Sequence, residues 1–462
     1  MSDYTIRRYR QSLILGLIGV VKDLFPSEQL KIAHSILDGV YCELNGSLLS
    51  SREVQKIEDH LRTWVLADQA IASEPRKDHL YHCQIDNHVI NTIYPPLERS
   101  GSLKYFKLIH FSPGFILLFP NANEPETLAP FVSPEKLSAT FSETQHWLEN
   151  LHLSTVQDVN AIITAKSSHD LICLAEALHE KKISLIADQI FDKRRNVRVI
   201  LISGPTSSGK TTFAQRLSTQ LRVNGLRPVA LSLDNYFLAR EDTPCDSCGE
   251  YDFECIEALD LPLLANHLSA LIRGEEVETP VFDFVNGRRS PTGICMNLCP
   301  DEILVIEGIH ALNPYLVPTL DHNQTFKIYV SALFQLNIDP YNRVPTTDVR
   351  LIRRLVRDDK FRGIKPEKTL AQWDSVRRGE NNNIFPYQEE ADVMFNSSLL
   401  YELNALRPFA EHLLISITQE CPNYATAVHL LTLLSFFDQL DTSTVPFNSI
   451  LREFLGGCTY NN

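Results

Sequence analysis

The sequence predicts an α/β protein, in which a parallel sheet covered by helices follows an α+β unit. From residue 197 onward, short apolar runs alternate with helical patterns, as in parallel strands joined by crossover helices. A glycine-rich loop links the first of these runs to its helix. Before residue 155, helix and strand signals mix without that alternation. The length of 462 residues agrees with two or three domains.

Composition limits the classes of function. The chain is 44% hydrophobic and 22% charged, which is ordinary for a globular protein, and its net charge is −14. This acidic balance argues against nucleic acid or an anionic membrane as the main partner. The apolar run from Leu13 to Val21 lacks a signal-peptide cleavage site, and no stretch is long enough to span a bilayer. A cytoplasmic location is therefore expected.

The first unit combines several element types. The sequence predicts a helix from Leu13 to Leu24 that Pro26 ends, and strands within Leu30–Leu44 around the turn Asp38-Gly39. It also predicts a helix from Ser51 to Ala70 with a capping box of Ser50 and Glu53, and a hairpin from Leu103 to Phe119 around Pro113-Gly114. A helical segment follows. The predicted boundaries separate a first domain, a helical linker, the parallel-sheet domain and a helical extension, at residues 1–155, 156–196, 197–415 and 416–462.

Five apolar segments are the candidate parallel strands, with helices expected between them. They are Val197–Ile202, Pro228–Leu233, Ile303–Ile306, Phe326–Val330 and Asp392–Phe395. In such sheets, ligands bind beyond the carboxyl ends of the strands. The residues that follow these segments are therefore the candidate site residues.

The loop after the first strand fits a phosphate-binding pattern. Gly204 to Thr211 matches G-x-x-x-x-G-K-[ST] between a strand and a helix. In this motif backbone N–H groups wrap nucleotide phosphates, Lys210 reaches the β/γ oxygens, and the Thr211 hydroxyl coordinates Mg²⁺. ATP and Mg²⁺ are therefore the predicted ligands. The predicted ATP contacts in the loop and the first helical turn are Gly204, Pro205, Thr206, Ser207, Ser208, Gly209, Lys210, Thr211 and Thr212.

Two acidic residues follow other predicted strands. Asp234 follows the second strand, where a carboxylate can accept the proton of an attacking hydroxyl. Glu307 follows the third strand, where an acid can hold Mg²⁺ together with Thr211. The intervening segments 249–254 and 280–289 mix aromatic and acidic residues, which is typical of a pocket that stacks a planar base and binds sugar hydroxyls.

A run of arginines follows the fourth predicted strand. In a helix from Thr347, the arginines at positions 350, 353, 354 and 357 share one face. Guanidinium groups bind phosphate oxygens through two hydrogen bonds, so the run predicts an anion clamp. Arg362 and the hinge candidate Gly363 come next, and they predict a lid that closes over the phosphates.

Two cysteine pairs flank the predicted substrate segments, namely Cys245 with Cys248 and Cys295 with Cys299. Four thiolates can hold a structural zinc, but the second spacing is wider than the usual C-x₂-C. Unpaired thiols are the favoured interpretation, and zinc is the alternative.

The first unit resembles the second, editing-type domain of threonyl-tRNA synthetases. The similarity lies in Val21–Pro26, Asp38–Tyr41 and Ile57-Glu58. That family builds its site from an H-x-x-x-H pair and a later Cys and His, which fall here near Gln11, Leu15, Thr92 and Pro96. These four residue types cannot perform the family's metal or hydrolytic chemistry. The resemblance therefore implies a scaffold or binding module without hydrolytic activity, and retained RNA contact is the alternative.

The second resemblance is to the uridine kinase/phosphoribulokinase family of P-loop kinases, and the whole chain resembles its two-domain bacterial nucleoside kinases. Besides the phosphate loop, it rests on Asp234-Asn235-Tyr236, Tyr251–Glu254, Pro280–Phe284, Glu307-Gly308, Thr347–Leu351, Ala391–Val393 and Ser449–Gly457.

This resemblance implies transfer of the ATP γ-phosphoryl group to a ribonucleoside 5′-hydroxyl. It makes Asp234 the base, places Lys210, Arg354 and Arg357 in the catalytic set, and adds Arg362 to the ATP contacts. The implied nucleoside contacts are Tyr236, Phe253, Glu254, Phe282, Phe284 and Arg350, of which Glu254 would hold the ribose hydroxyls.

Two departures leave the base preference open. The family's base-reading histidine is replaced by Asn286-Gly287, and Phe282 stands where a tyrosine is usual. The predicted partner is a small-molecule nucleoside, with neither membrane nor nucleic acid, and a homo-oligomer is left open. The alternatives are a kinase of another sugar or phosphosugar, and a non-catalytic RNA-binding ATP switch.

Overall fold

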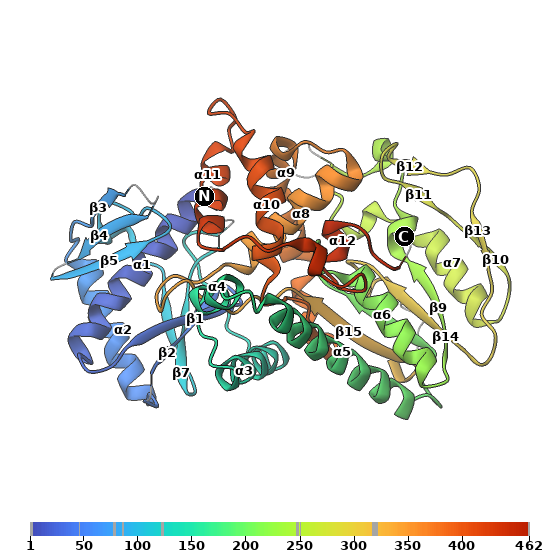
Figure 1. Cartoon of the computed structure of the whole chain (residues 1–462), viewed down its shortest axis with the longest axis horizontal. Helices are drawn as coiled ribbons and strands as arrows, with labels where there is room; N and C mark the ends of the chain where they lie inside the picture. The colour runs from blue at the N-terminus through green and yellow to red at the C-terminus, as the bar shows by residue number, and fades with distance from the viewer. Residues whose placement is uncertain are drawn as a thin grey trace. The chain divides into compact units, whose positions relative to one another are not determined.

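The computed structural model describes residues 3–45, 47–76, 80–85, 87–121, 124–245, 249, 251–316 and 322–460. The chain forms two compact units, shown in Figure 1. Unit 1 consists of Met1–Thr164, Phe334–Asp348 and Tyr424–Asp438, and unit 2 of Ala165–Leu333, Val349–Asn423 and Gln439–Asn462. The predicted boundaries at 155, 196 and 415 assume continuous segments, whereas these units alternate along the chain.

Unit 1 is built from two antiparallel sheets and helices. A four-stranded sheet has the order β1-β2-β7-β6, and a three-stranded sheet has the order β3-β4-β5. Leu13, Ile57 and Phe115 lie in the buried core between these elements. The strands are β1 (Leu30–Ile36), β2 (Gly39–Leu44), β3 (Ala72–Pro75), β4 (Tyr81–Ile85), β5 (His88–Thr92), β6 (Lys107–Phe111) and β7 (Gly114–Leu118). The helices are α1 (Asp3–Leu24), α2 (Ser51–Leu66), α3 (Glu135–Asn150), α4 (Val156–Thr164) and α11 (Tyr424–Ser435).

The local signals in unit 1 are confirmed. Helix α1 ends at Leu24, before Pro26, and β6 and β7 form the predicted hairpin. At the start of α2, the Ser50 hydroxyl accepts the Glu53 N–H at 3.3 Å, and the Glu53 carboxylate accepts the Ser50 N–H at 2.8 Å. This is the predicted capping box. The helix ends at Leu66, four residues before the predicted Ala70.

A buried carboxylate joins the three segments of unit 1. Asp348 accepts hydrogen bonds from Arg7 Nη1 at 2.8 Å and Tyr94 Oη at 3.2 Å, and lies 2.7 Å from His429 Nε2. Burial opposes ionisation, but Arg7 and His429 hold the pKa of Asp348 well below its usual range. Asp348 thus forms a buried ionic link from its own segment to α1 and to α11.

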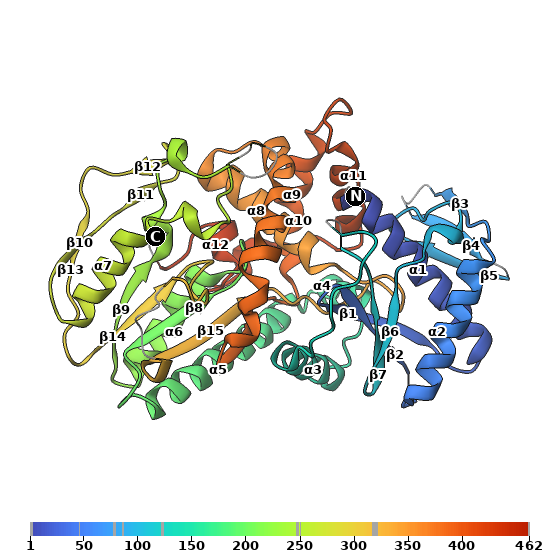
Figure 2. The ribbon, with the colours of Figure 1, turned by 180° about the vertical axis from the view of Figure 1, so that it is seen from behind.

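Unit 2 contains the predicted parallel sheet. All five predicted strands are confirmed, and they run parallel in the order β16-β15-β8-β14-β9. Helices α5 and α6 lie in front of this sheet in Figure 1 and behind it in Figure 2. The strands are β8 (Val199–Ser203), β9 (Arg227–Ser232), β14 (Glu302–Glu307), β15 (Thr325–Ser331) and β16 (Val393–Asn396).

The other elements of unit 2 surround this sheet. Leu264 and Leu268 of α7 join the apolar cluster of Val199 and Leu304 on two central strands. Two short strand pairs, β10 with β13 and β11 with β12, lie outside the main sheet. The helices are α5 (Ser168–Asp192), α6 (Lys210–Val223), α7 (Leu261–Ile272), α8 (Thr346–Arg362), α9 (Pro366–Asn383), α10 (Glu402–Ile415) and α12 (Arg452–Leu455), with α8 beginning in unit 1. The short strands are β10 (Val277–Thr279), β11 (Phe282–Asp283), β12 (Arg288–Arg289) and β13 (Ile294–Met296).

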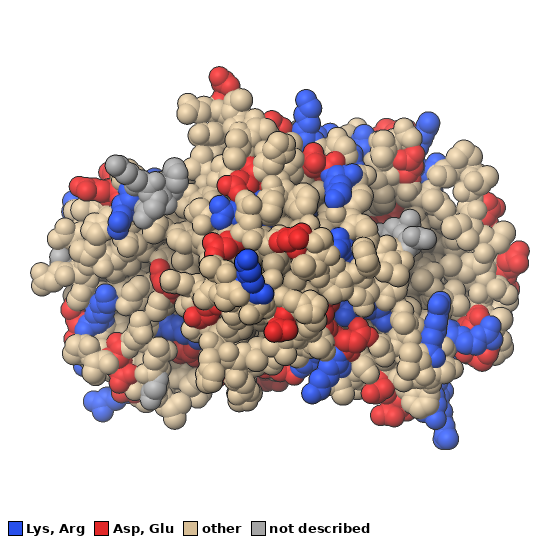
Figure 3. Space-filling model, viewed as in Figure 1, with Lys and Arg blue, Asp and Glu red and all other residues tan. Residues whose placement is uncertain are grey.

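The surface and the helices bear on possible partners. In the described part of the chain, no helix has the length and apolar character needed to cross a membrane. On the face drawn in Figure 3, basic and acidic side chains are interspersed among the coloured residues, without a broad basic patch.

Candidate active site

The phosphate loop connects β8 to α6 at the carboxyl edge of the sheet. Gly204 approaches the neighbouring strand so closely that a Cβ there would lie 2.0 Å from the Val330 carbonyl oxygen. Gly209 has a φ of +86° and caps α6 in the left-handed conformation that glycine tolerates best. Both glycines of the motif are therefore required by the backbone path. The arrangement of strand, loop and helix is that of a phosphate-binding P-loop.

Several buried polar atoms around the loop lack a hydrogen-bond partner within the described structure. They include the hydroxyl oxygens of Ser207 and Ser208 and one carboxylate oxygen of Glu254. Lys210 is also buried, and its ammonium group donates to the Pro205 carbonyl at 3.2 Å. Unsatisfied buried polar groups are costly. Hydroxyl and ammonium donors beside a glycine cradle suit the phosphate oxygens of a nucleotide.

Glu307 ends β14 next to the end of β9. Its carboxylate accepts a 2.6 Å hydrogen bond from the Ser232 hydroxyl, because Ser232 is its register partner in the parallel pair. Burial and the nearby charge of Asp234 raise the pKa of Glu307 to about 7. The positive charge of Lys210 acts to lower the pKa of Glu307. The predicted pair of strand-end acids is thus close enough to interact.

Asp234 lies in a single turn after β9, in the 3₁₀ segment Leu233–Tyr236. The side chain is half-buried and lies near both Glu307 and Arg362, since its charge influences the pKa of each. The next residue fixes this turn, because the Asn235 side-chain oxygen accepts the Phe282 N–H at 3.1 Å. That bond connects the predicted base to one of the two aromatic segments.

The arginines of α8 are paired with buried carboxylates. Arg350 binds Glu380 and also donates to the Thr206 carbonyl at 3.0 Å, while the Thr206 N–H donates to Glu380 at 3.1 Å. Arg350 therefore braces the phosphate loop. Arg353 binds Glu402 at 2.5 Å.

The last arginines of α8 surround Asp358. Arg354 binds one carboxylate oxygen at 3.1 Å and Arg357 binds the other at 2.9 Å, and Arg362 lies 3.8 Å away. Burial favours the protonated form of Asp358, but these guanidinium groups hold its pKa below its usual range. The positive charge of Arg357 and burial lower the pKa of Arg362 to about 10. The predicted clamp is therefore divided: Arg354 and Arg357 surround Asp358 together with Arg362, whereas Arg350 and Arg353 pair with Glu380 and Glu402.

Glu254, the predicted substrate acid, is buried. Burial and the neighbouring charge of Glu380 raise its pKa to about 7. Helix α9 reaches it closely, since a Cβ on Gly379 would lie 2.2 Å from the Glu254 Cβ. Arg350, Arg354 and Lys210 favour its ionised form. The structure thus places Glu254 among the residues that flank the phosphate loop.

The predicted aromatic contacts fall into two groups. Phe282 and Phe284 pack edge to face at 5.1 Å, and the Arg362 guanidinium lies 4.8 Å from the Phe284 ring centroid. Phe253 is half-buried beside Tyr251. Tyr236 is fully buried in the core, and its hydroxyl lies 3.0 Å from His267 Nδ1. Tyr236 is therefore a core residue, in contrast to the predicted nucleoside contact.

Three partner acids were missed by the sequence reasoning, namely Glu380, Glu402 and Glu453. Glu453, from α12, accepts hydrogen bonds from the N–H and the hydroxyl of Thr212 at 3.2 and 3.0 Å. No local motif marks these acids. The partners that tie them to the phosphate loop or to α8 are Arg350, Arg353 and Thr212, which lie 30, 49 and 241 residues away in the sequence, so spacing alone gives no signal.

The cysteine pairs contribute no ligand set in the described residues. Cys245 and Cys295 are exposed and free, Cys299 is half-buried and free, and Cys248 lies outside the described residues. Within the described ranges, no three His, Cys, Asp or Glu side chains are grouped as a metal site.

The sequence profile described as "Phosphoribulokinase / Uridine kinase family" matches residues 199–400. A protein named uridine kinase from Deinococcus deserti is 32% identical over 197 residues, which cover 42% of this chain and 86% of that relative. This chain belongs to the phosphoribulokinase/uridine kinase family. A protein named uridine kinase from Staphylococcus haemolyticus is 30% identical over 200 residues, covering 43% of this chain and 87% of that relative.

Among solved structures, one described as a possible uridine kinase from Bacillus stearothermophilus has a TM-score of 0.33 and 18% identity, covering 47% of this chain and 98% of that one. Family membership makes the chain a kinase, a phosphotransferase with an alcohol acceptor and ATP as co-substrate. The matched residues include the phosphate loop, both strand-end acids and α8. Residues 401–460 follow them.

Proposed function

We propose that this chain is an ATP- and Mg²⁺-dependent nucleoside kinase of the uridine kinase type, which transfers the γ-phosphoryl group to a ribonucleoside 5′-hydroxyl. The observation that carries the proposal is the meeting of the phosphate loop, Asp234 and Glu307 at one edge of the parallel sheet. The relatives named uridine kinase support this class of acceptor.

In this proposal the cations hold the transferred group. Lys210 binds the β- and γ-phosphate oxygens, and Arg354, Arg357 and Arg362 neutralise the charge that develops during transfer. Because Asp358 orients these arginines before ATP arrives, little reorganisation is needed during the reaction. Arg350 acts differently from the implied substrate contact, since it positions the phosphate loop through Thr206 and Glu380.

Mg²⁺ fits the residues at the loop. The Thr211 hydroxyl and the Glu307 carboxylate would hold it, and it would neutralise charge on the phosphate oxygens. Mg²⁺ is usually bound through one or two carboxylates together with substrate phosphates and water, and Glu307 lies near a second carboxylate, that of Asp234. Glu307 must be ionised to serve, so its raised pKa is relevant to activity near neutral pH.

Asp234 is the proposed general base. It accepts the proton of the 5′-hydroxyl as that oxygen attacks phosphorus, a contribution of about 10²- to 10⁴-fold in rate. Glu254 would accept hydrogen bonds from ribose hydroxyls, and Phe282 and Phe284 would pack against the base. The unpartnered carboxylate oxygen of Glu254 supports its role.

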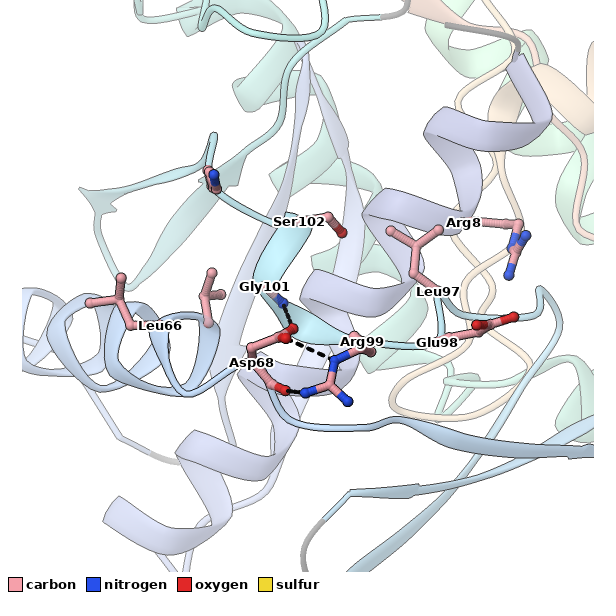
Figure 4. Close-up of a pocket in the computed structure, with 10 residues that line it drawn as sticks. Arg8, Leu66, Asp68, Leu97, Glu98, Arg99, Gly101 and Ser102 are labelled. Atoms are coloured by element: carbon pink, nitrogen blue, oxygen red, sulfur yellow. Dashed lines mark hydrogen bonds and ion pairs between the residues drawn. The ribbon is translucent and has the colours of Figure 1, made fainter.

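Unit 1 is proposed to be a scaffold without hydrolytic chemistry. Of the positions where the synthetase-type site would lie, Leu15, Thr92 and Pro96 are buried. Figure 4 shows a nearby hollow of about 780 Å³, lined by Arg8, Asp68, Glu98, Arg99 and Lys104 among others. Arg99 is paired with Asp68 there at 2.8 Å. This mixed lining does not favour RNA.

Two measurements test the proposed function. Asp234→Asn should retain ATP binding and reduce turnover at least about a hundredfold, because the proposed proton acceptor is lost. Unchanged turnover would remove that role from Asp234. A panel of ribonucleosides, sugars and sugar phosphates with labelled ATP identifies the acceptor, and phosphorylation of only non-nucleoside acceptors would contradict the proposal.

A further inference from the structure

The carboxyl-terminal segment of unit 2 contacts the phosphate loop. Ile450 lies against Gly209, since a Cβ on that glycine would be 2.5 Å from the Ile450 Cγ2. Three residues later, Glu453 accepts both the N–H and the hydroxyl of Thr212. Both residues lie beyond the part of the chain that the family profile matches. The contact is therefore an addition to the matched kinase region.

Several contacts anchor this segment within unit 2. Phe454 is fully buried and lies 5.1 Å from the Arg353 guanidinium, and Lys360 donates to the Leu455 carbonyl. Arg452 donates to the Thr442 carbonyl at 3.1 Å and to the Gly456 carbonyl at 3.3 Å, which closes the loop around α12. These bonds place the Glu453 carboxylate at the first turn of α6.

Thr212 belongs to the set of donors that a phosphate loop uses. The first intrahelical bond of α6 runs from the Phe213 N–H to the Gly209 carbonyl. The N–H of Thr212 precedes that bond, so it is one of the amino-terminal donors without a partner inside the helix. Such donors bind phosphate in a phosphate loop. One N–H cannot serve a carboxylate and a phosphate oxygen fully at once.

We infer that Glu453 competes with the nucleotide phosphates for Thr212, and that it thereby sets the affinity of the chain for ATP. Nucleotide binding would displace the carboxylate, which moves away from Thr212 while the buried part of the segment stays in place. The charge of Glu453 also opposes an incoming phosphate, and it already contributes to the raised pKa of Glu307. The inference concerns the ATP side of the proposed function and rests on it only for the identity of the nucleotide.

The test compares ATP affinity by calorimetric titration of the full chain with no acceptor present. Glu453→Gln keeps the size of the side chain and removes its charge, so ATP should bind about three- to thirty-fold more tightly. Glu453→Asp keeps the charge but shortens the side chain, so it should also bind ATP more tightly. The control Glu420→Gln removes an exposed acid elsewhere in unit 2 and should leave the affinity unchanged.

Unchanged or weaker ATP binding in a folded Glu453→Gln protein would overturn the inference, and weaker binding would make Glu453 a supporting acid of the nucleotide site. If Glu453→Gln does not fold, Glu453→Asp decides by the same criterion. The experiment is independent of the acceptor. If the chain phosphorylates no nucleoside, the proposed function is contradicted. Tighter ATP binding by Glu453→Gln would still support this inference in that case.

Discussion

At the scale of single residues, the buried acids of the site differ in pKa because they meet different neighbouring charges. Glu254 and Glu307 are buried beside other carboxylates, which raises the pKa of each. Asp358 is buried among three guanidinium groups, which hold its pKa down. Acids with separated pKa values can share a small site because each meets a different charge.

The raised pKa of Glu307 predicts a pH-dependent affinity for Mg²⁺. In the proposed Mg²⁺ site, protonation of Glu307 removes a ligand, so the apparent Mg²⁺ affinity should weaken as pH falls from 8 to 6, through the pKa of about 7. The measurement is the Mg²⁺ dependence of turnover or of ATP binding across that range.

A second variant tests the cause of this shift. Asp234→Asn removes the neighbouring negative charge, so the pKa of Glu307 should fall and the midpoint of Mg²⁺ affinity should move to lower pH. Because this variant is expected to turn over slowly, ATP binding is the suitable measurement. The exposed Glu241→Gln serves as the control. A midpoint that stays in place in Asp234→Asn contradicts the assigned cause.

Sequence reasoning predicted the residues at the strand ends better than their partners. Lys210, Asp234 and Glu307 could be located because a motif or the end of a strand marks each one. Glu380 and Glu402 gave no such signal, since they reach Arg350 and Arg353 only through tertiary folding. Asp358 was visible in the sequence, but the burial that makes it the centre of the arginine set was not.

At the scale of elements, α8 shows how one helix can organise a cationic site. Its arginines do share a face, as the spacing predicts, but Arg350 and Arg353 are fully buried and bound to acids. Only Arg362, at the end of the helix, reaches toward Phe284. The helix therefore serves as a structural brace and carries the cations that are proposed to bind phosphate.

Asp358→Asn should strongly disturb this end of α8. It leaves buried guanidinium groups without their counter-ion, which should lower the free energy of unfolding by about 3–5 kcal/mol. Its neighbour Asp359 is exposed, so Asp359→Asn should change stability by no more than about 0.5 kcal/mol. Urea denaturation of both variants measures the difference, and equal stabilities would remove the structural role of Asp358.

The capping box of α2 predicts a smaller effect in unit 1. Ser50→Ala removes the side-chain acceptor of the Glu53 N–H, which should lower the free energy of unfolding by about 1 kcal/mol. The adjacent Ser51 is exposed in the first helical turn, so Ser51→Ala is the matched control. Thermal unfolding followed by circular dichroism compares the two, and the cap would be energetically unimportant if both variants melted together.

The elements themselves show which patterns are readable in a sequence. The five parallel strands were predictable because runs of apolar residues mark strands buried on both faces. The beginning of α1 was not, because charged residues surround its buried Ile6 and Tyr9. An apolar run identifies the middle of such a helix, and tertiary burial decides where it starts.

At the scale of the whole molecule, each unit is assembled from three separate segments. Within unit 1, the Asn337 side chain donates to the Ile32 carbonyl at 2.8 Å, and Asp348 binds Arg7. A division of the sequence into consecutive domains cannot represent these contacts. Long-range pairings of this kind leave no trace in local composition, so sequence reasoning could not place them.

Asp348 predicts the acid sensitivity of unit 1. A carboxylate with a depressed pKa stabilises the fold above the pKa of about 4 that it has when unfolded, and this contribution is lost as pH falls below that value. Asp348→Asn should lower the free energy of unfolding by about 3–5 kcal/mol at pH 7. Below pH 4, the free energy of unfolding of this variant should fall less steeply than that of the unmodified chain. Acid titration followed by tryptophan fluorescence measures this, with exposed Asp59→Asn as the control.

The order in which unit 1 receives its segments has a consequence for biosynthesis. Asp348 and His429 leave the ribosome long after Arg7 and Tyr94, to which they bind. The amino-terminal part of unit 1 therefore lacks its two later segments while most of unit 2 is translated. Nascent chains released before residue 424 should consequently be more sensitive to proteases across α1 than the finished polypeptide.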